Sequence, residues 1–154
     1  MATILLVIIY LAFISLGLPD SLLGAAWPVA YADLGASVSY AGLISIFITV
    51  GTVISSLVSV RVIRRFGTGP VTAACVLLTA SALLGISYAD RFVALCLLAV
   101  PLGLGGGAID AALNNYVALH YKASHMSFLH SFWGVGATVG PLIISYYLAH
   151  GSNW

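Results

Sequence analysis

The stretch FVALCLLAVPLGLGGGAI, residues 92–109, contains no charged side chain and is followed at once by Asp110. A helix that crosses a membrane needs roughly 17 to 25 mostly apolar residues, and this stretch has that length. Four more stretches lack Asp, Glu, Lys and Arg, namely residues 2–19, 34–60, 66–89 and 123–154. Each is continuously apolar, whereas the strands of a transmembrane β-barrel alternate. The sequence therefore predicts an all-α integral membrane protein with five transmembrane helices.

The composition supports the same class. Charged residues make up 6% of the 154 residues and hydrophobic residues 62%, whereas an ordinary soluble domain carries roughly 25% charged residues. A soluble domain of this size leaves too much surface in water to hide so many apolar side chains. The composition excludes a cytosolic enzyme, a nucleic-acid-binding protein and a disordered chain. Cys75 and Cys96 each lie in an apolar run and match neither a metal-binding spacing nor a disulfide framework.

The turns between apolar runs give helix positions and an orientation. We expect helices over about residues 4–30, 40–60, 71–88, 92–119 and 130–148. We expect a basic turn at 61–70, a short turn at 89–91 and a polar loop at 120–129. Basic residues gather in the first and last of these turns, so the positive-inside rule places both turns and the N-terminus in the cytoplasm. The first of these turns carries Arg61, Arg64 and Arg65 and the last carries Lys122, whereas the turn at 89–91 has only Arg91.

A short motif occurs twice. Gly17-x-x-Asp20-x-x-Leu23 recurs as Gly107-x-x-Asp110-x-x-Leu113, so the first two helices resemble the fourth and fifth. The two copies enter the membrane from opposite sides, which is the pattern of an inverted repeat in secondary transporters. A repeat of this kind predicts a sixth helix as the partner of the third, and hence a truncated chain.

Small residues spaced four apart predict close helix packing, because small side chains let helix backbones approach in a membrane. They occur in three of the expected helices. The positions that we assign to packing are Gly51, Ser55, Ser59, Gly103, Gly107, Gly136, Gly140 and Pro141.

Asp20 and Asp110 are the main candidates for a functional site. A charged side chain at the bilayer centre costs roughly 2.5–3.5 kcal/mol on insertion scales, so such residues rarely face lipid. An apolar setting favours the neutral form of a carboxyl group. We therefore expect each to hold a proton near neutral pH and to release it when the site opens to water. The alternatives are a structural hydrogen bond between helices and a carboxylate that lies near the lipid headgroups.

Neighbouring side chains fit a site for a polar solute. Asn114 lies on the same helical face as Asp110, Asn115 is adjacent, and Trp27 lies two turns after Asp20. A carboxylate, an amide and an indole ring suit a sugar, although Trp27 could instead be an interfacial anchor. We predict that Trp133 is such an anchor. The histidines, His120, His125 and His130, are predicted to lie in or beside a solvated loop rather than at a metal site.

Three segments carry a resemblance to a known family. They are Gly17 to Gly24 (GLPDSLLG), Gly103 to Asn114 (GLGGGAIDAALN) and His130 to Pro141 (HSFWGVGATVGP). With them the chain resembles the N-terminal half of a major facilitator superfamily transporter, and within that superfamily the fucose-permease-like sugar–proton symporters. The resemblance implies a six-helix half built from a 3+3 inverted repeat, with helix 6 and the C-terminal half missing here. It also implies that Asp20 and Asp110 serve proton coupling and sugar binding.

The resemblance has departures. The superfamily has Gly-x-x-x-Asp-Arg-x-Gly between its second and third helices, and here Val60 and Arg64 replace the first Gly and the Asp. The segment from Gly136 to Pro141 also resembles part of the signature of drug antiporters, but the second glycine pair of that signature is absent.

The expected function is secondary active transport in the plasma or inner membrane. The expected partners are the lipid bilayer, a small solute, protons and the missing half, with no cofactor, no metal and no nucleic acid. The leading hypothesis is proton-coupled uptake of a sugar or similar small polar solute by alternating access. The alternatives are a proton-coupled exporter of amphipathic compounds and a membrane subunit or fragment that does not transport.

Overall fold

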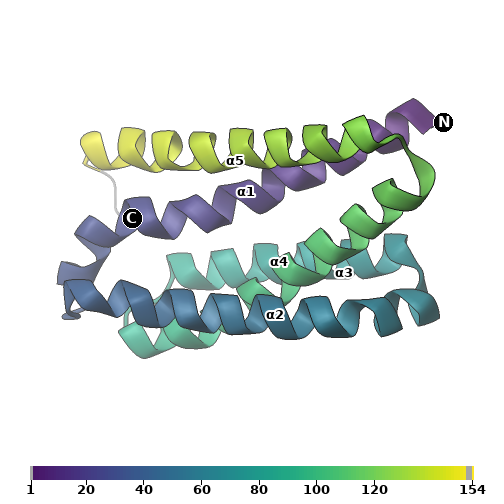
Figure 1. Cartoon of the computed structure of the whole chain (residues 1–154). Helices are drawn as coiled ribbons and strands as arrows, with labels where there is room; N and C mark the ends of the chain where they lie inside the picture. Colours follow the sequence, from purple (N-terminus) through teal and green to yellow (C-terminus); the bar gives the residue numbers. More distant parts are fainter. Residues whose placement is uncertain (1, 152–153) are drawn as a thin grey trace. The chain divides into compact units, whose positions relative to one another are not determined.

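The computed structural model describes residues 2–151 and Trp154, and in these residues it contains helices and no strand. Five long helices follow one another, with one short 3-10 turn, η1 (Val38–Tyr40), before the second (Figure 1). Their bounds are α1 (Ala2–Asp33), α2 (Ala41–Phe66), α3 (Thr68–Ser87), α4 (Phe92–His120) and α5 (Ala123–Ala149). All five are long and apolar enough to cross a membrane. The predicted five-helix, all-α class is confirmed.

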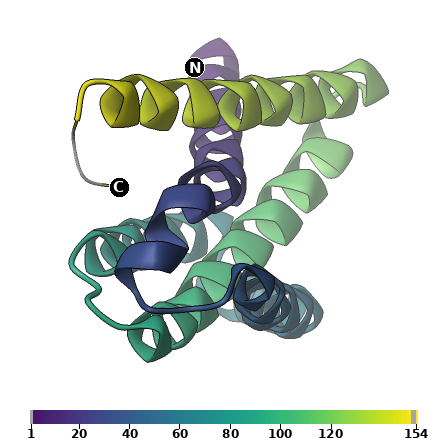
Figure 2. The ribbon, with the colours of Figure 1, turned by 90° about the vertical axis from the view of Figure 1, so that its left-hand side faces the viewer.

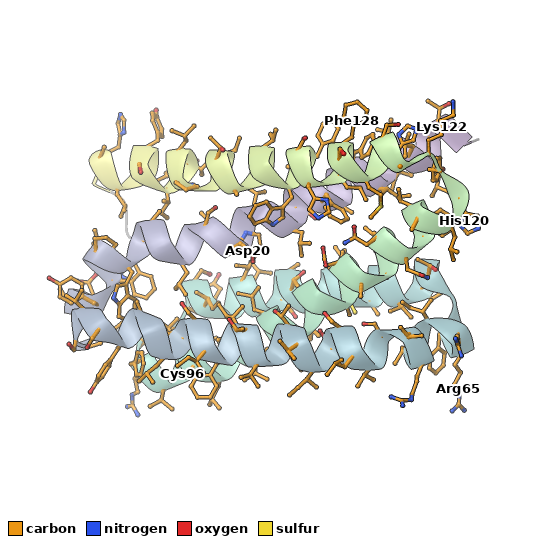
Figure 3. The ribbon with its side chains drawn as sticks, viewed as in Figure 1. Asp20, Arg65, Cys96, His120, Lys122 and Phe128 are labelled. Atoms are coloured by element: carbon orange, nitrogen blue, oxygen red, sulfur yellow. The ribbon has the colours of Figure 1, made fainter. Side chains whose placement is uncertain are left out.

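Helix α2 extends beyond its predicted end at residue 60. Arg61, Arg64 and Arg65 therefore lie on its last turns, and the prediction that they form a loop was wrong. Arginine is a good helix former, and its charge is favourable at the negative end of the helix dipole. The helix ends at Gly67, whose φ of 84° suits glycine, and Figure 3 shows Arg65 near this end.

Helix α5 begins at Ala123, seven residues before its predicted start. The expected polar loop at 120–129 is instead a short connection through Tyr121 and Lys122, and His125 and His130 belong to the helix. Polar residues suggested a loop, but neither glycine nor proline lies between Lys122 and Gly134 to interrupt a helix. The short turn predicted at 89–91 is confirmed, since α3 ends at Ser87 and α4 begins at Phe92.

The chain divides into two compact units, the first made of residues 1–30 and 117–154. In this unit α1 packs against α5 through glycine (Figure 2). A Cβ on Gly17 would collide with the Trp133 carbonyl oxygen, and one on Gly136 would collide with that of Ile14. A Cβ on Gly140 would lie 2.7 Å from Ser21 Oγ. The two backbones therefore touch directly, as the small residues predict.

The second unit, residues 31–116, holds α2, α3 and most of α4. A Cβ on Gly103 would collide with the Ile48 carbonyl oxygen. A Cβ on Gly51 would lie 3.0 Å from the Val100 carbonyl oxygen. The Thr52 hydroxyl donates to the Gly103 carbonyl at 3.2 Å, and Ser56 donates to that of Gly107 at 3.2 Å. Since lipid supplies no hydrophobic force between helices, such packing and hydrogen bonds hold α2 against α4.

The α1–α5 contact and the α4–α2 contact have the same pattern. Gly17 against Trp133 matches Gly103 against Ile48, and Gly136 against Ile14 matches Gly51 against Val100. A third contact pairs Gly140 of α5 with Ser21 Oγ of α1, and Gly107 of α4 with Ser55 Oγ of α2, so glycine and serine exchange helices between the two pairs. The two helix pairs therefore share a contact based on glycine, and the internal repeat stays a prediction.

The contacts fit two registers of this repeat. The approach of Gly17 to the Trp133 carbonyl matches that of Gly103 to the Ile48 carbonyl, and it equally matches that of Gly107 to the Thr52 carbonyl. The second match is the predicted alignment of Gly17 with Gly107. Gly103 and Gly107 lie about one turn apart, so the predicted register stays a prediction.

Substitution of Gly136 by alanine tests the backbone contact of α1 with α5. We expect Gly136→Ala to lower the free energy of unfolding by about 1–3 kcal/mol, because the new methyl group would overpack the contact with Ile14. Gly134→Ala is the matched control, since a Cβ there meets nothing within 4 Å. The measurement is thermal unfolding of the purified protein in detergent. Equal stability of the two variants would contradict the packing.

Candidate functional site

Asp20 lies well inside the membrane-spanning part of α1, between Thr3 and Asp33, and Figure 3 shows it away from both ends of the helix. Its side chain is exposed. The indole N–H of Trp133 on α5 donates a hydrogen bond to Asp20 Oδ2 at 3.0 Å. A hydrogen bond to a charged group contributes about 1.5–3 kcal/mol. Asp20 and Trp133 therefore form a polar pair within the first unit.

The prediction that Trp133 is an interfacial anchor was wrong, because its indole is paired with a carboxylate within the span. The error followed from the predicted start of the helix. With α5 beginning at Ala123, Trp133 lies about 15 Å along the helix, at about 1.5 Å per residue. The close approach of Gly17 to the Trp133 carbonyl then brings the indole within reach of Asp20, one turn farther along α1.

Asp110 lies on α4 in the second unit and has its own polar neighbour. Asn114 Nδ2 donates to Asp110 Oδ1 at 2.9 Å, which confirms the predicted proximity of these two side chains. This bond fixes the amide so that Asn114 Oδ1 points elsewhere, and that oxygen is buried without a hydrogen-bond partner. An unsatisfied buried acceptor is costly and is a place where a donor from a solute or water would be stabilised. Asn115 is exposed.

Trp27, predicted to line the site, is packed rather than open. Its side chain is 4% exposed, whereas that of Trp133 is 38% exposed. In this conformation Trp27 therefore presents little of its ring to a solute, and its lining role stays a prediction.

Of the three histidines, His120 and His130 are exposed, and His125 differs from the prediction. The prediction that His125 is solvated was wrong, because its Nδ1 hydrogen-bonds to the Tyr10 hydroxyl at 2.7 Å and the bond is partly buried. Tyr10 also stacks on Phe132, with ring centroids 4.6 Å apart. His130 Nδ1 bonds to the Met126 carbonyl within its own helix. Among the described residues, no group of three or more His, Cys, Asp or Glu side chains is placed to hold a metal.

A comparison with family models decides the family. The model of the Major Facilitator Superfamily matches residues 9–154, nearly the whole chain. The chain belongs to the Major Facilitator Superfamily. No curated protein and no solved structure gives a significant match.

Membership in the Major Facilitator Superfamily agrees with the five apolar helices. The chain is a multi-pass membrane protein of a family of secondary transporters rather than of enzymes. In such transporters, polar groups within the membrane line the path of the solute and the coupling ion. Asp20 with Trp133 and Asp110 with Asn114 are two polar pairs within the described spans.

Cysteine labelling tests whether Asp20 faces water. In a background with Cys75→Ser and Cys96→Ser, we expect Asp20→Cys to react with a water-soluble thiosulfonate, because a charged residue in a span faces water or protein. Leu11→Cys is the control. Leu11 is 58% exposed but lies on the opposite side of α1, given about 100° per residue, and we expect it to face lipid. Equal, slow labelling of both variants would place Asp20 against lipid.

Proposed function

We propose that this chain serves proton-coupled uptake of a sugar or a similar small polar solute by alternating access. The observation that carries the proposal is the exposed Asp20 carboxylate inside an apolar span, held by the indole N–H of Trp133. A carboxylate in that position exchanges a proton with water when the pathway is open. It also accepts hydrogen bonds from solute hydroxyl groups.

The packing of the two helix pairs supports a functional role for Asp20. The α4–α2 contact uses the same close approach at glycine as the α1–α5 contact, and the hydrogen bonds across it come from the hydroxyl groups of Thr52 and Ser56. Helix packing of this kind therefore does not require a carboxylate. Since a charge in mid-membrane costs roughly 2.5–3.5 kcal/mol or more, a role in proton or solute binding is the better explanation for it.

Asp110 and Asn114 form a second polar pair, within the second unit. Asn114 Oδ1 needs a donor, which a solute hydroxyl or a water molecule provides. We propose that Asp110 shares proton coupling with Asp20, and that Asn114, Asn115 and Trp27 line the solute path. Alternating access also requires a second bundle of helices as the other wall of the pathway. We place the transporter in the cell membrane with the N-terminus in the cytoplasm, because the arginines lie at the end of α2.

Export of amphipathic cations is the second candidate. A carboxylate beside an indole ring also suits an organic cation, which the ring face attracts. The two candidates differ in the charge of the solute and in the direction of transport. An uptake assay that compares a neutral hexose with an organic cation distinguishes them.

Removal of the two carboxylates tests proton coupling. We expect Asp20→Asn and Asp110→Asn, made in the complete protein, to reduce pH-dependent hexose uptake by about tenfold or more, because each loses a charged acceptor worth about 1.5–3 kcal/mol. The measurement is the initial rate of radiolabelled hexose uptake into cells at several external pH values. Asp33→Asn, at the end of α1, is the control and should keep the wild-type profile. Unchanged pH dependence in both site variants would refute the proposal.

A further inference from the structure

We propose that α2 binds an anionic phospholipid, whose phosphate lies against Arg61, Arg64 and Arg65 and whose acyl chain lies on the exposed apolar face that precedes them. The inference goes beyond the proposed function, because it does not depend on which solute is transported. It assigns a binding surface to basic residues that otherwise indicate only the orientation of the chain.

The three arginines form one exposed face at the end of α2. They stand at positions i, i+3 and i+4 of the helix, which places their side chains on the same side. All three are exposed, and Figure 3 shows Arg65 at this end of the helix. The guanidinium group of Arg65 also lies over the ring of Phe66, 5.6 Å from its centroid. Guanidinium groups bind phosphate oxygens through two parallel N–H bonds, so this face suits a phosphate group.

Carboxylates of the second unit lie away from this face. Neither α2 nor α3 contains Asp or Glu, and Asp33 and Asp90 adjoin the other ends of these two helices. Asp110 bonds to Asn114 and lies about ten residues, or roughly 15 Å, before the end of α4. Arg64 stands where the superfamily signature has Asp, which adds positive charge in place of negative. A surface with charge of one sign attracts an anionic partner.

The length of α2 places the arginines at the level of the lipid headgroups. The helix has 26 residues, which span about 39 Å at about 1.5 Å per residue. The hydrocarbon core of a bilayer is only about 30 Å thick. Residues 41–60 contain no charged side chain and are sufficient to cross it. Residues 61–66 therefore extend into the headgroup layer, where the phosphate groups of the lipids lie.

An exposed apolar face leads to the arginines and favours a lipid over a soluble anion. Val50, Ile54 and Leu57 precede Arg61 by three- and four-residue steps, so they lie on the same side of α2. Their side chains are 51%, 51% and 71% exposed. A soluble anion or an acidic peptide would use only the charged end of this surface, whereas a phospholipid uses both parts.

The expected orientation of the chain favours an anionic headgroup. The positive-inside rule places the arginines on the cytoplasmic side. The cytoplasmic leaflet carries a negative surface potential because it contains anionic lipids, and these attract basic residues next to a span. An anionic phospholipid therefore matches the charge, the depth and the apolar face of this surface.

Native mass spectrometry of the complete protein in detergent tests the headgroup preference. The probes are phosphatidylglycerol, which is anionic, and phosphatidylcholine with the same acyl chains, which has no net charge. We expect the wild type to bind phosphatidylglycerol about tenfold more tightly. Glycerol 3-phosphate at the same concentration has the phosphate without acyl chains and should not displace the lipid. Equal binding of the two lipids, or displacement by glycerol 3-phosphate, would overturn the proposal.

Combined substitution of the arginines tests their role. Loss of a hydrogen bond to a charged group weakens binding about tenfold, so the variant with Arg61→Gln, Arg64→Gln and Arg65→Gln should bind phosphatidylglycerol at least tenfold more weakly. Arg91→Gln is the matched control, because Arg91 is also exposed but follows the opposite end of α3. It should keep the wild-type affinity. Equal affinities of the triple variant and the control would contradict the assignment.

Photo-crosslinking identifies what covers the apolar face and leaves the arginines intact. Benzoylphenylalanine replaces Leu57 in the complete protein, which is irradiated in bilayers that contain phosphatidylglycerol. We expect adducts with the mass of a lipid, read by mass spectrometry. Adducts with another helix of the complete protein, or no lipid adduct, would overturn the proposal, whether or not the protein transports a hexose.

Discussion

The direct contact of helix backbones at glycine is the constraint on which the rest of the structure depends. Lipid is as apolar as the side chains of these helices, so burial of apolar surface does not hold them together. Gly17 and Gly136 remove the side chains that would separate α1 from α5. Gly51 and Gly103 do the same for α2 and α4. Each contact is close enough to fix the register of one helix against the other.

That register determines where the polar groups meet. Since Gly17 touches the backbone at Trp133, the indole extends beside the next turn of α1 and reaches Asp20. A bulky residue at position 17 would move the indole away from the carboxylate. In the α4–α2 pair the same close contact brings hydroxyl groups of Thr52 and Ser56 to the carbonyl oxygens of α4. The same kind of close backbone contact at glycine therefore positions a candidate binding pair in one unit and structural hydrogen bonds in the other.

The sequence predicted the number of helices and one polar pair, but not all of the helix ends. Long uncharged runs are sufficient to predict spans, and spacing by four placed Asn114 beside Asp110. Helix ends were missed where polar or basic residues continue a helix, as at Arg61 and His125. The pairing of Asp20 with Trp133 depends on contact between segments far apart in the sequence, which the spacing of residues within one helix does not give. Correct placement of the start of α5 would have removed Trp133 from the interface.

Solute movement under an imposed proton gradient tests the central claim most directly, namely that carboxylates within these helices couple protons to a polar solute. The complete protein in liposomes would receive a proton gradient, acidic outside, with radiolabelled hexose at equal concentration on both sides. The account predicts that hexose accumulates in the vesicles above the outside concentration, and that this accumulation collapses when a protonophore removes the gradient. Equal concentrations on both sides, or net extrusion of hexose, would contradict it.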